Sequence, residues 1–148
     1  MHFSTTALFT ALFAATSALA QTGFCPEAAR FGGVKISPST LSPGETFTVM
    51  ANLTCAVQLG NTPTFLDYYV DGTATHAISG PVLIARRTYN GTAAAPVDIF
   101  PVKLPEWFYF TDATYAFRMV NSFARAGPTG ESVITSGSIS VAMNITGI

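Results

Sequence analysis

Charged side chains are scarce in this sequence. Of its 148 residues, 7 are lysine or arginine and 8 are aspartate or glutamate, which gives a net charge of −1. Binding to nucleic acid or to an anionic membrane surface needs a basic patch, and the sole basic doublet here is Arg86–Arg87. The composition therefore argues against nucleic acid as a partner. We interpret the doublet as a solvated pair near the end of a strand.

Histidine is rarer still, with His2 and His76 as its two occurrences. A Ser-His-Asp triad would depend on His76 in a Gly/Thr-rich loop, and no G-x-S-x-G turn supplies a nucleophile. A zinc site needs three or four His, Cys or carboxylate ligands, and glycine motifs that hold phosphate are missing. The sequence therefore predicts no metal, no cofactor and no catalysis, with a small hydrolase as the third-ranked hypothesis.

No apolar run reaches the ~20 residues that a membrane-spanning helix needs. The first residues, "MHFSTTALFTALFAATSALA", contain a shorter apolar run over 7–15 and end in the small residues Ala18-Leu19-Ala20. This arrangement is typical of a secretory signal peptide, although the usual lysine or arginine at its start is absent. We predict that residues 1–20 are a cleaved signal peptide and that the protein is secreted, extracellular and not inserted into a membrane.

Cysteine is limited to Cys25 and Cys55, both beyond the signal peptide. In an oxidising compartment an even pair is typical of one disulfide. A bridge that closes a loop of about 30 residues would stabilise the fold by roughly 3–4 kcal/mol. One bridge cannot replace a hydrophobic core, so a cysteine-rich framework is excluded and a packed domain is expected.

The chain beyond the signal peptide is predicted to be all-β. Apolar and polar residues alternate over short segments, which are separated by stretches rich in Gly, Pro, Ser, Asn and Asp. This pattern is typical of an immunoglobulin-like antiparallel β-sandwich of about seven strands. We expect an N-terminal arm over 21–32, with a short helical turn, and one sandwich domain over 33–148. The expected strands are 34–36, 46–55, 64–70, 82–88, 97–104, 115–123, and 133 together with 139–145.

Three sequons for N-linked glycosylation occur, at Asn52, Asn90 and Asn144. In "TFTVMANLTC" and "SISVAMNIT" the apolar residues share one parity, so Asn52 and Asn144 fall on the outward face of their strands. Asn90 precedes a glycine in a predicted turn. All three asparagines are therefore free to carry a glycan, and we predict a glycoprotein.

The segment "DATYAF" predicts a tyrosine corner. Tyr115 stands two residues before the apolar Phe117. Phe117 would occupy the position that a cysteine occupies in antibody domains. In such a corner the tyrosine hydroxyl bonds to the backbone a few residues upstream. The alternative is a tyrosine that merely begins a strand.

Asp67 and Asp71 flank two tyrosines in "TFLDYYVDG". On a strand, Asp67, Tyr69 and Asp71 face outward, and the residues between them face the core. At ~3.3 Å per residue the two carboxylates stand ~13 Å apart, which is wider than the ~5–9.5 Å of glycosidase pairs. A catalytic pair would need a closer cross-strand partner such as Asp98. We interpret the segment as the solvated face of a strand that a ligand could contact.

Aromatic residues are plentiful, and "PEWFYF" at 105–110 contains a run of consecutive ones. Alternation cannot turn all of them inward. Trp107 and Tyr109 are therefore candidates for stacking on a sugar ring or for contact with a partner. The alternative is that they close one end of the sandwich.

The runs "VKISPSTLSPGETFTV", "TCA", "LDYY" and "IARRT" follow one another along the chain. In these runs the chain resembles a family of small secreted proteins of filamentous fungi, basidiomycetes above all. The resemblance covers nearly all of the sequence beyond the signal peptide. It implies secretion and the sandwich fold, and it brings no activity or catalytic residue with it. A fainter similarity, through "ISPSTLSPGETFTV", is to lipid-binding ML-type sandwiches, which usually carry more cysteines.

These observations together predict a secreted, non-catalytic recognition module that binds a glycan or a protein outside the cell or at the cell wall. The alternative is a carrier that holds an apolar ligand between the sheets. A hydrophobic content of 49% and a mean hydropathy of +0.39 would suit a carrier, which requires an internal cavity.

Overall fold

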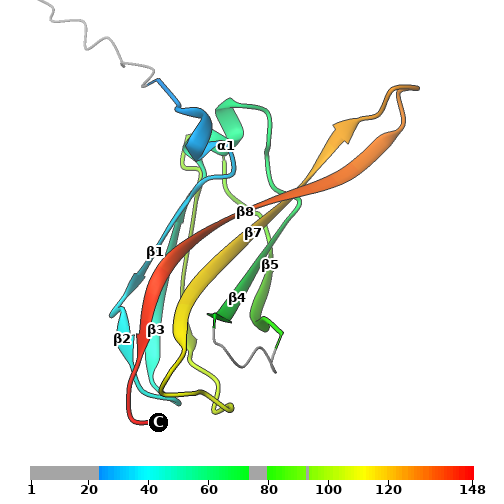
Figure 1. The fold of residues 1–148 in the computed structure, drawn as a ribbon. Coiled ribbons are helices and arrows are strands. Elements are labelled where there is room, and N and C mark those ends of the chain that lie inside the picture. Colours follow the sequence, from blue (N-terminus) through cyan, green and yellow to red (C-terminus); the bar gives the residue numbers. More distant parts are fainter. Residues whose placement is uncertain (1–23, 74–79, 93) are drawn as a thin grey trace, which may run out of the picture.

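The protein is a sandwich of two β-sheets (Figure 1). The computed structural model describes residues 24–73, 80–92 and 94–148. The predicted signal peptide over 1–20, the first residues of the arm and His76 lie outside the described residues. Within the described ranges, no helix is long and apolar enough to cross a membrane.

Strands make up most of the described chain. The helical segments are η1 (Glu27–Ala29), a single 3₁₀ turn, and α1 (Thr54–Gln58). The strands are β1 (Gly33–Ser37), β2 (Thr40–Leu41), β3 (Thr46–Asn52), β4 (Phe65–Thr73), β5 (Val82–Thr88), β6 (Val97–Lys103), β7 (Thr114–Ala126) and β8 (Ser132–Ile145).

The strand order is that of an immunoglobulin-like sandwich. One sheet has three strands in the order β1-β3-β6, and the other has five in the order β2-β8-β7-β4-β5. Neighbouring strands are antiparallel except β2, which pairs in parallel with β8. The predicted all-β immunoglobulin-like fold is therefore confirmed. The prediction lacked β2, because a strand of two residues is too short to show alternation.

Alternation along the strands places the core side chains. On β3, Phe47, Val49 and Ala51 are buried, and the residues between them are exposed. On β7, Phe117 and Met119 are buried, and the residues next to them along the strand are half-buried. Burying a large apolar side chain completely contributes about 1.5–3 kcal/mol, so these rows hold the two sheets together.

Aromatic rings fill the space between the sheets. The ring centroids of Phe47 and Phe117 lie 5.6 Å apart in an edge-to-face contact. Tyr68 lies 5.0 Å from Phe100 and 5.9 Å from Phe117, so it contacts rings from both sheets. A carrier of apolar ligands would need a cavity in the place that these rings occupy.

Strand β3 ends at Asn52 rather than at residue 55 as predicted. There the Oδ1 of Asn52 accepts a hydrogen bond from the backbone N–H of Thr54 at 3.0 Å, and the chain turns into α1. Leu53 and Ala56 still reach the core because they lie three residues apart, on one face of the helical turn. A helix this short shows no periodicity that the sequence could reveal.

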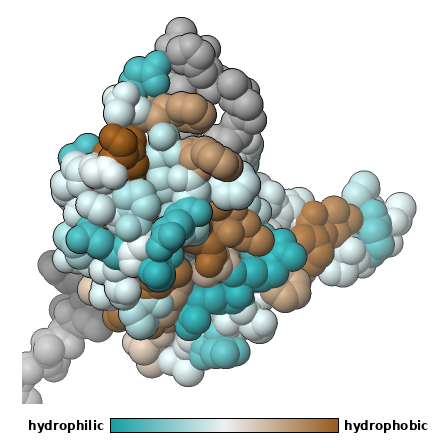
Figure 2. Space-filling view, turned by 90° about the horizontal axis from the view of Figure 1, so that it is seen from below, coloured by the Kyte–Doolittle hydropathy of each residue, from teal (hydrophilic) through white to brown (hydrophobic). Residues whose placement is uncertain are grey.

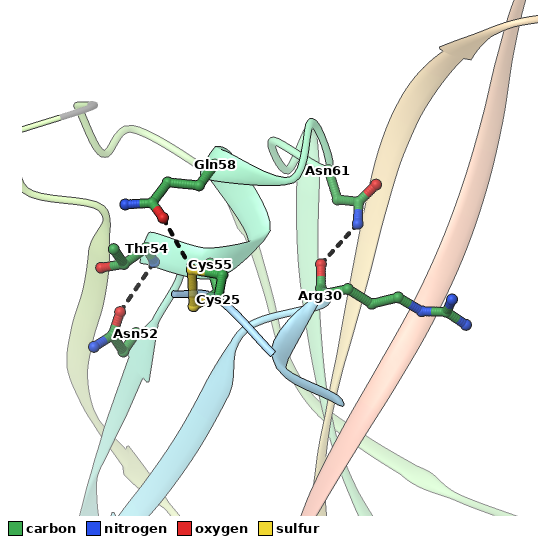
Figure 3. Close-up of a disulfide and its surroundings, with 7 residues drawn as sticks. All are labelled: Cys25, Arg30, Asn52, Thr54, Cys55, Gln58 and Asn61. Carbon is green, nitrogen blue, oxygen red and sulfur yellow. Dashed lines mark hydrogen bonds between the residues drawn. A yellow bond between two sulfur atoms is a disulfide. The ribbon is translucent and has the colours of Figure 1, made fainter. Parts of the chain in front are cut away.

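The predicted disulfide joins Cys25 in the N-terminal arm to Cys55 in α1 (Figure 3). A second contact holds the arm nearby, because the Nδ2 of Asn61 donates to the carbonyl oxygen of Arg30 at 2.7 Å (Figure 3). The described part of the arm is therefore fixed to the sandwich.

Strands β7 and β8 extend beyond the body of their sheet as a hairpin (Figure 1). Strand β4 pairs with β7 only as far as Ser122, whereas β7 and β8 stay paired up to Ala126 and Ser132. Val133 and Ile134 are exposed there. Viewed from below, apolar colouring continues onto the projecting hairpin (Figure 2). Strand β7 is thus longer than the predicted 115–123 and carries its last residues into solvent.

Replacing Phe117 by alanine is expected to lower the free energy of unfolding by about 3–5 kcal/mol, because its ring packs between the sheets. Urea unfolding followed by circular dichroism measures this change. Ile134→Ala on the exposed hairpin is the control, with an expected change within about 0.5 kcal/mol. Equal effects of the two substitutions would contradict this description of the core.

Candidate binding surface

The outward face of β4 carries Asp67, and its carboxylate is not solvated as the sequence analysis predicted. The Asp67 side chain is 8% exposed. It accepts two hydrogen bonds from its cross-strand neighbour Arg86, at 2.6 Å from Nε and 2.8 Å from Nη2. The long guanidinium side chain lies in solvent and covers the short carboxylate. Alternation correctly placed Asp67 away from the core, but it could not show this cover.

Asp71 is also ion-paired. The Nε of Arg118 lies 2.7 Å from its Oδ2, and the Nη2 of Arg118 donates to its Oδ1 at 3.2 Å. The same guanidinium lies 5.2 Å from the ring centroid of Tyr69. The outward face of β4 is therefore a network of paired charges around one tyrosine, and neither carboxylate is an open acidic group.

Asp98 does not approach this face, because β6 belongs to the other sheet. It accepts a hydrogen bond from the hydroxyl of Tyr68 at 2.9 Å, and the Nε of Arg87 lies 2.8 Å from its Oδ2. Burial, reinforced by the charge of Asp98, raises the pKa of the Tyr68 hydroxyl well above its ordinary value. Arg87 and Tyr68 come from the five-stranded sheet, so this cluster links the two sheets.

The doublet Arg86–Arg87 lies near the end of β5 with both side chains exposed, as predicted, but each arginine is also ion-paired. Successive residues of a strand point to opposite faces, so Arg86 reaches Asp67 on the outside and Arg87 reaches Asp98 on the inside. Sequence reasoning missed both partners because they lie on different strands, far from the doublet along the chain.

The most exposed aromatic pair lies in the loop between β6 and β7. Trp107 is 51% and Phe108 is 76% exposed, and their ring centroids are 5.6 Å apart. We call this pair the aromatic platform. It lies at the end of the sandwich where β7 begins, the lower end in Figure 1.

Tyr109 turns away from the platform and into the loop. Its hydroxyl donates a hydrogen bond to the carbonyl oxygen of Pro105 at 2.9 Å, and its ring packs edge-to-face on Tyr115 at 5.5 Å. Burial, with a smaller effect of Tyr115, raises the pKa of Tyr109 to about 12. The exposed partner of Trp107 is thus Phe108, which the sequence analysis did not single out.

Tyr115 anchors the other side of the loop. Its hydroxyl accepts a hydrogen bond from the backbone N–H of Phe110 at 2.6 Å and lies 3.3 Å from the carbonyl oxygen of the same residue. A hydroxyl bonded to the backbone five residues upstream has the geometry of a tyrosine corner. Both ends of the segment that carries the platform are therefore fixed by tyrosine hydroxyls.

The asparagines of the three sequons, Asn52, Asn90 and Asn144, are all exposed. Asn52 ends β3, Asn90 follows β5, and Asn144 lies near the end of β8. Each is sterically open to a glycan. Across residues 24–73, 80–92 and 94–148, no three His, Cys, Asp or Glu side chains are grouped so as to hold a metal ion.

No protein-family model and no curated protein matches this chain. Its fold is similar to the solved structure of a superoxide reductase (neelaredoxin) from Ignicoccus hospitalis, at 13% identity over 78% of this chain and 82% of that chain, with a TM-score of 0.43. Two variants of that protein match at 14% identity and TM-scores of 0.42 and 0.45. They cover 76% and 80% of this chain, and 79% and 83% of their own.

These solved structures are of enzymes, and that finding overturns the prediction that the chain is not an enzyme. The prediction rested on missing motifs, which cannot exclude catalysis on such a fold, and it is withdrawn. The likeness is too distant to assign a reaction to this chain.

The platform loop should make stability depend on alkaline pH. Tyr109 has a pKa of about 12 in the folded chain against an ordinary value of 10.0, so its contribution is complete below pH 10 and is lost as the pH rises toward 12. The Tyr68 hydroxyl acts in the same direction. We expect the urea midpoint to fall over this range, and to fall less steeply in Tyr109→Phe. Parallel curves for the two proteins would contradict the buried position of Tyr109.

Proposed function

We propose that this chain is a secreted glycoprotein that acts as a recognition module outside the cell or at the cell wall, and that the aromatic platform binds a glycan. The observation that carries the proposal is the joint exposure of Trp107 and Phe108 on a fixed loop. A protein ligand is the second form of the same proposal.

Large aromatic side chains in water are costly unless a ligand covers them. β-Linked pyranoses present flat faces of C–H groups, which pack on aromatic rings, and their hydroxyls remain free to bond to water. Trp107 and Phe108 stand edge-to-face, so they offer two surfaces of different orientation. Such a site would contact more than one sugar unit of an oligosaccharide.

The fixed loop supports binding because its backbone has little conformational freedom left to lose when a ligand binds. Tyr109 and Tyr115 bond to the backbone at Pro105 and Phe110, on either side of the platform. A surface that is ordered before the ligand arrives loses less conformational entropy on association. The predicted signal peptide over 1–20 and the Cys25–Cys55 disulfide support the extracellular location.

The experiment is a titration of the purified full chain with oligosaccharides of β-linked glucose, N-acetylglucosamine and mannose. Trp107 is the sole tryptophan, so its fluorescence reports the platform alone. We expect a saturable change with at least one sugar, and roughly tenfold weaker binding, or about 1.4 kcal/mol, for Trp107→Ala and Phe108→Ala when followed by calorimetry.

Phe65→Ala is the matched control, because Phe65 is an exposed aromatic residue on β4, away from the loop. It should bind as the unaltered chain does. Absence of binding to every sugar would overturn the glycan form of the proposal. Binding that survives both platform substitutions would place the site elsewhere.

A further inference from the structure

The outward face of the three-stranded sheet exposes apolar side chains to solvent. Met50 on β3 is 47% exposed, and Val97 and Ile99 on β6 are 41% and 53% exposed. Met50 and Ile99 stand directly opposite each other in the strand register. We call these three residues the apolar face. The other side of the same strands forms the core, so this sheet carries apolar side chains on both of its sides.

Two of the three sequon asparagines border the apolar face. Asn52 is the cross-strand partner of Val97, with its side chain on the same outward face. Asn90 lines a hollow of about 370 Å³ together with Val97 and Ile99. The third, Asn144, lies on β8 in the other sheet.

The amide of Asn52 is held in a position that suits attachment. Its Oδ1 accepts the backbone N–H of Thr54 at 3.0 Å, so its Nδ2, the atom that carries an N-glycan, points away from α1 (Figure 3). Within the described part of the chain, no hydrogen bond occupies that Nδ2. A hollow of about 630 Å³, lined by Phe24, Met50 and Asn52 among others, gives the first sugars room beside the sheet.

We infer that N-glycans on Asn52 and Asn90 cover the apolar face and keep it from associating with other molecules. A contiguous exposed apolar surface promotes association, and a bulky, hydrated glycan attached at its border occupies the space that a partner would need. A second copy of the chain could not stack on this face without displacing both glycans. The inference rests on the secretion stated under the proposed function.

This cover leaves the aromatic platform free. Asn52 and Val97 stand at one end of the β3–β6 pair, whereas Thr46 and Lys103 stand at the other, from which the chain enters the platform loop. Glycans at the first end are therefore attached at the end of the sheet opposite to the one that leads into the Trp107 loop.

The test compares two variants with the unaltered full chain, all expressed in a eukaryotic host that adds N-glycans. One variant combines Asn52→Gln with Asn90→Gln, and the other carries Asn144→Gln alone. Intact mass gives glycan occupancy, and fluorescence of the apolar dye ANS gives exposed apolar surface. We expect the double variant to lose two glycans and to bind several-fold more dye, with self-association on a sizing column. Asn144→Gln should lose one glycan and leave dye binding unchanged.

A rescue separates this effect from misfolding. Adding Met50→Thr, Val97→Thr and Ile99→Thr to the double variant keeps β-favouring residues on the strands but removes the apolar face, so dye binding should return to its original level. Secreted protein without glycans at Asn52 and Asn90, or dye binding that rises equally in Asn144→Gln, would overturn the inference and leave the Trp107 titration unaffected. Absence of the chain from the medium would instead overturn the proposed secretion as well.

Discussion

Tyr68 is the side chain on which the two sheets depend. Its ring contacts Phe100 of the opposite sheet and Phe117 of its own, and its hydroxyl needs a partner because it is buried. Asp98 supplies that partner from the opposite sheet, and Arg87 in turn balances the charge of Asp98. A single residue thus couples apolar packing to a polar link, which fixes how the two sheets face each other.

This filled interior leaves recognition to the surfaces of the sandwich. On the outward face of β4, Asp67 and Asp71 are each paired with an arginine, so that face presents no unpaired carboxylate to a ligand. Two surfaces that expose apolar side chains are the platform of Trp107 and Phe108 and the outward face of β1-β3-β6. They lie toward opposite ends of the fold, and their surroundings differ: tyrosine anchors support the first, and glycosylation sites border the second. That difference is why we assign ligand binding to one and a glycan cover to the other.

Local rules predicted much of the fold, since alternation alone identified the inward rows of β3 and β8 and the outward positions of Asn52 and Asn144. What lay beyond such rules was short or non-local. Two residues of β2 and one turn of α1 are too brief to leave a period in the sequence. The partners of Arg86 and Arg87 depend on which strands become neighbours. At the candidate site, alternation could not tell which ring of "WFYF" faces solvent, because the segment is a loop held by the hydroxyl hydrogen bonds of Tyr109 and Tyr115 rather than a strand.

The most direct test is an NMR titration of the chain with a β-linked oligosaccharide that binds in the fluorescence experiment. The chemical-shift changes of the backbone amides and of the indole N–H are mapped onto the structure. Trp107 contributes the sole indole N–H signal, so its response is unambiguous. The account predicts that the largest shifts fall on Trp107, Phe108 and the backbone of their loop, with the core rows unchanged. Saturable shifts that gather on the β4 face or on the apolar face, with the indole signal unmoved, would contradict it.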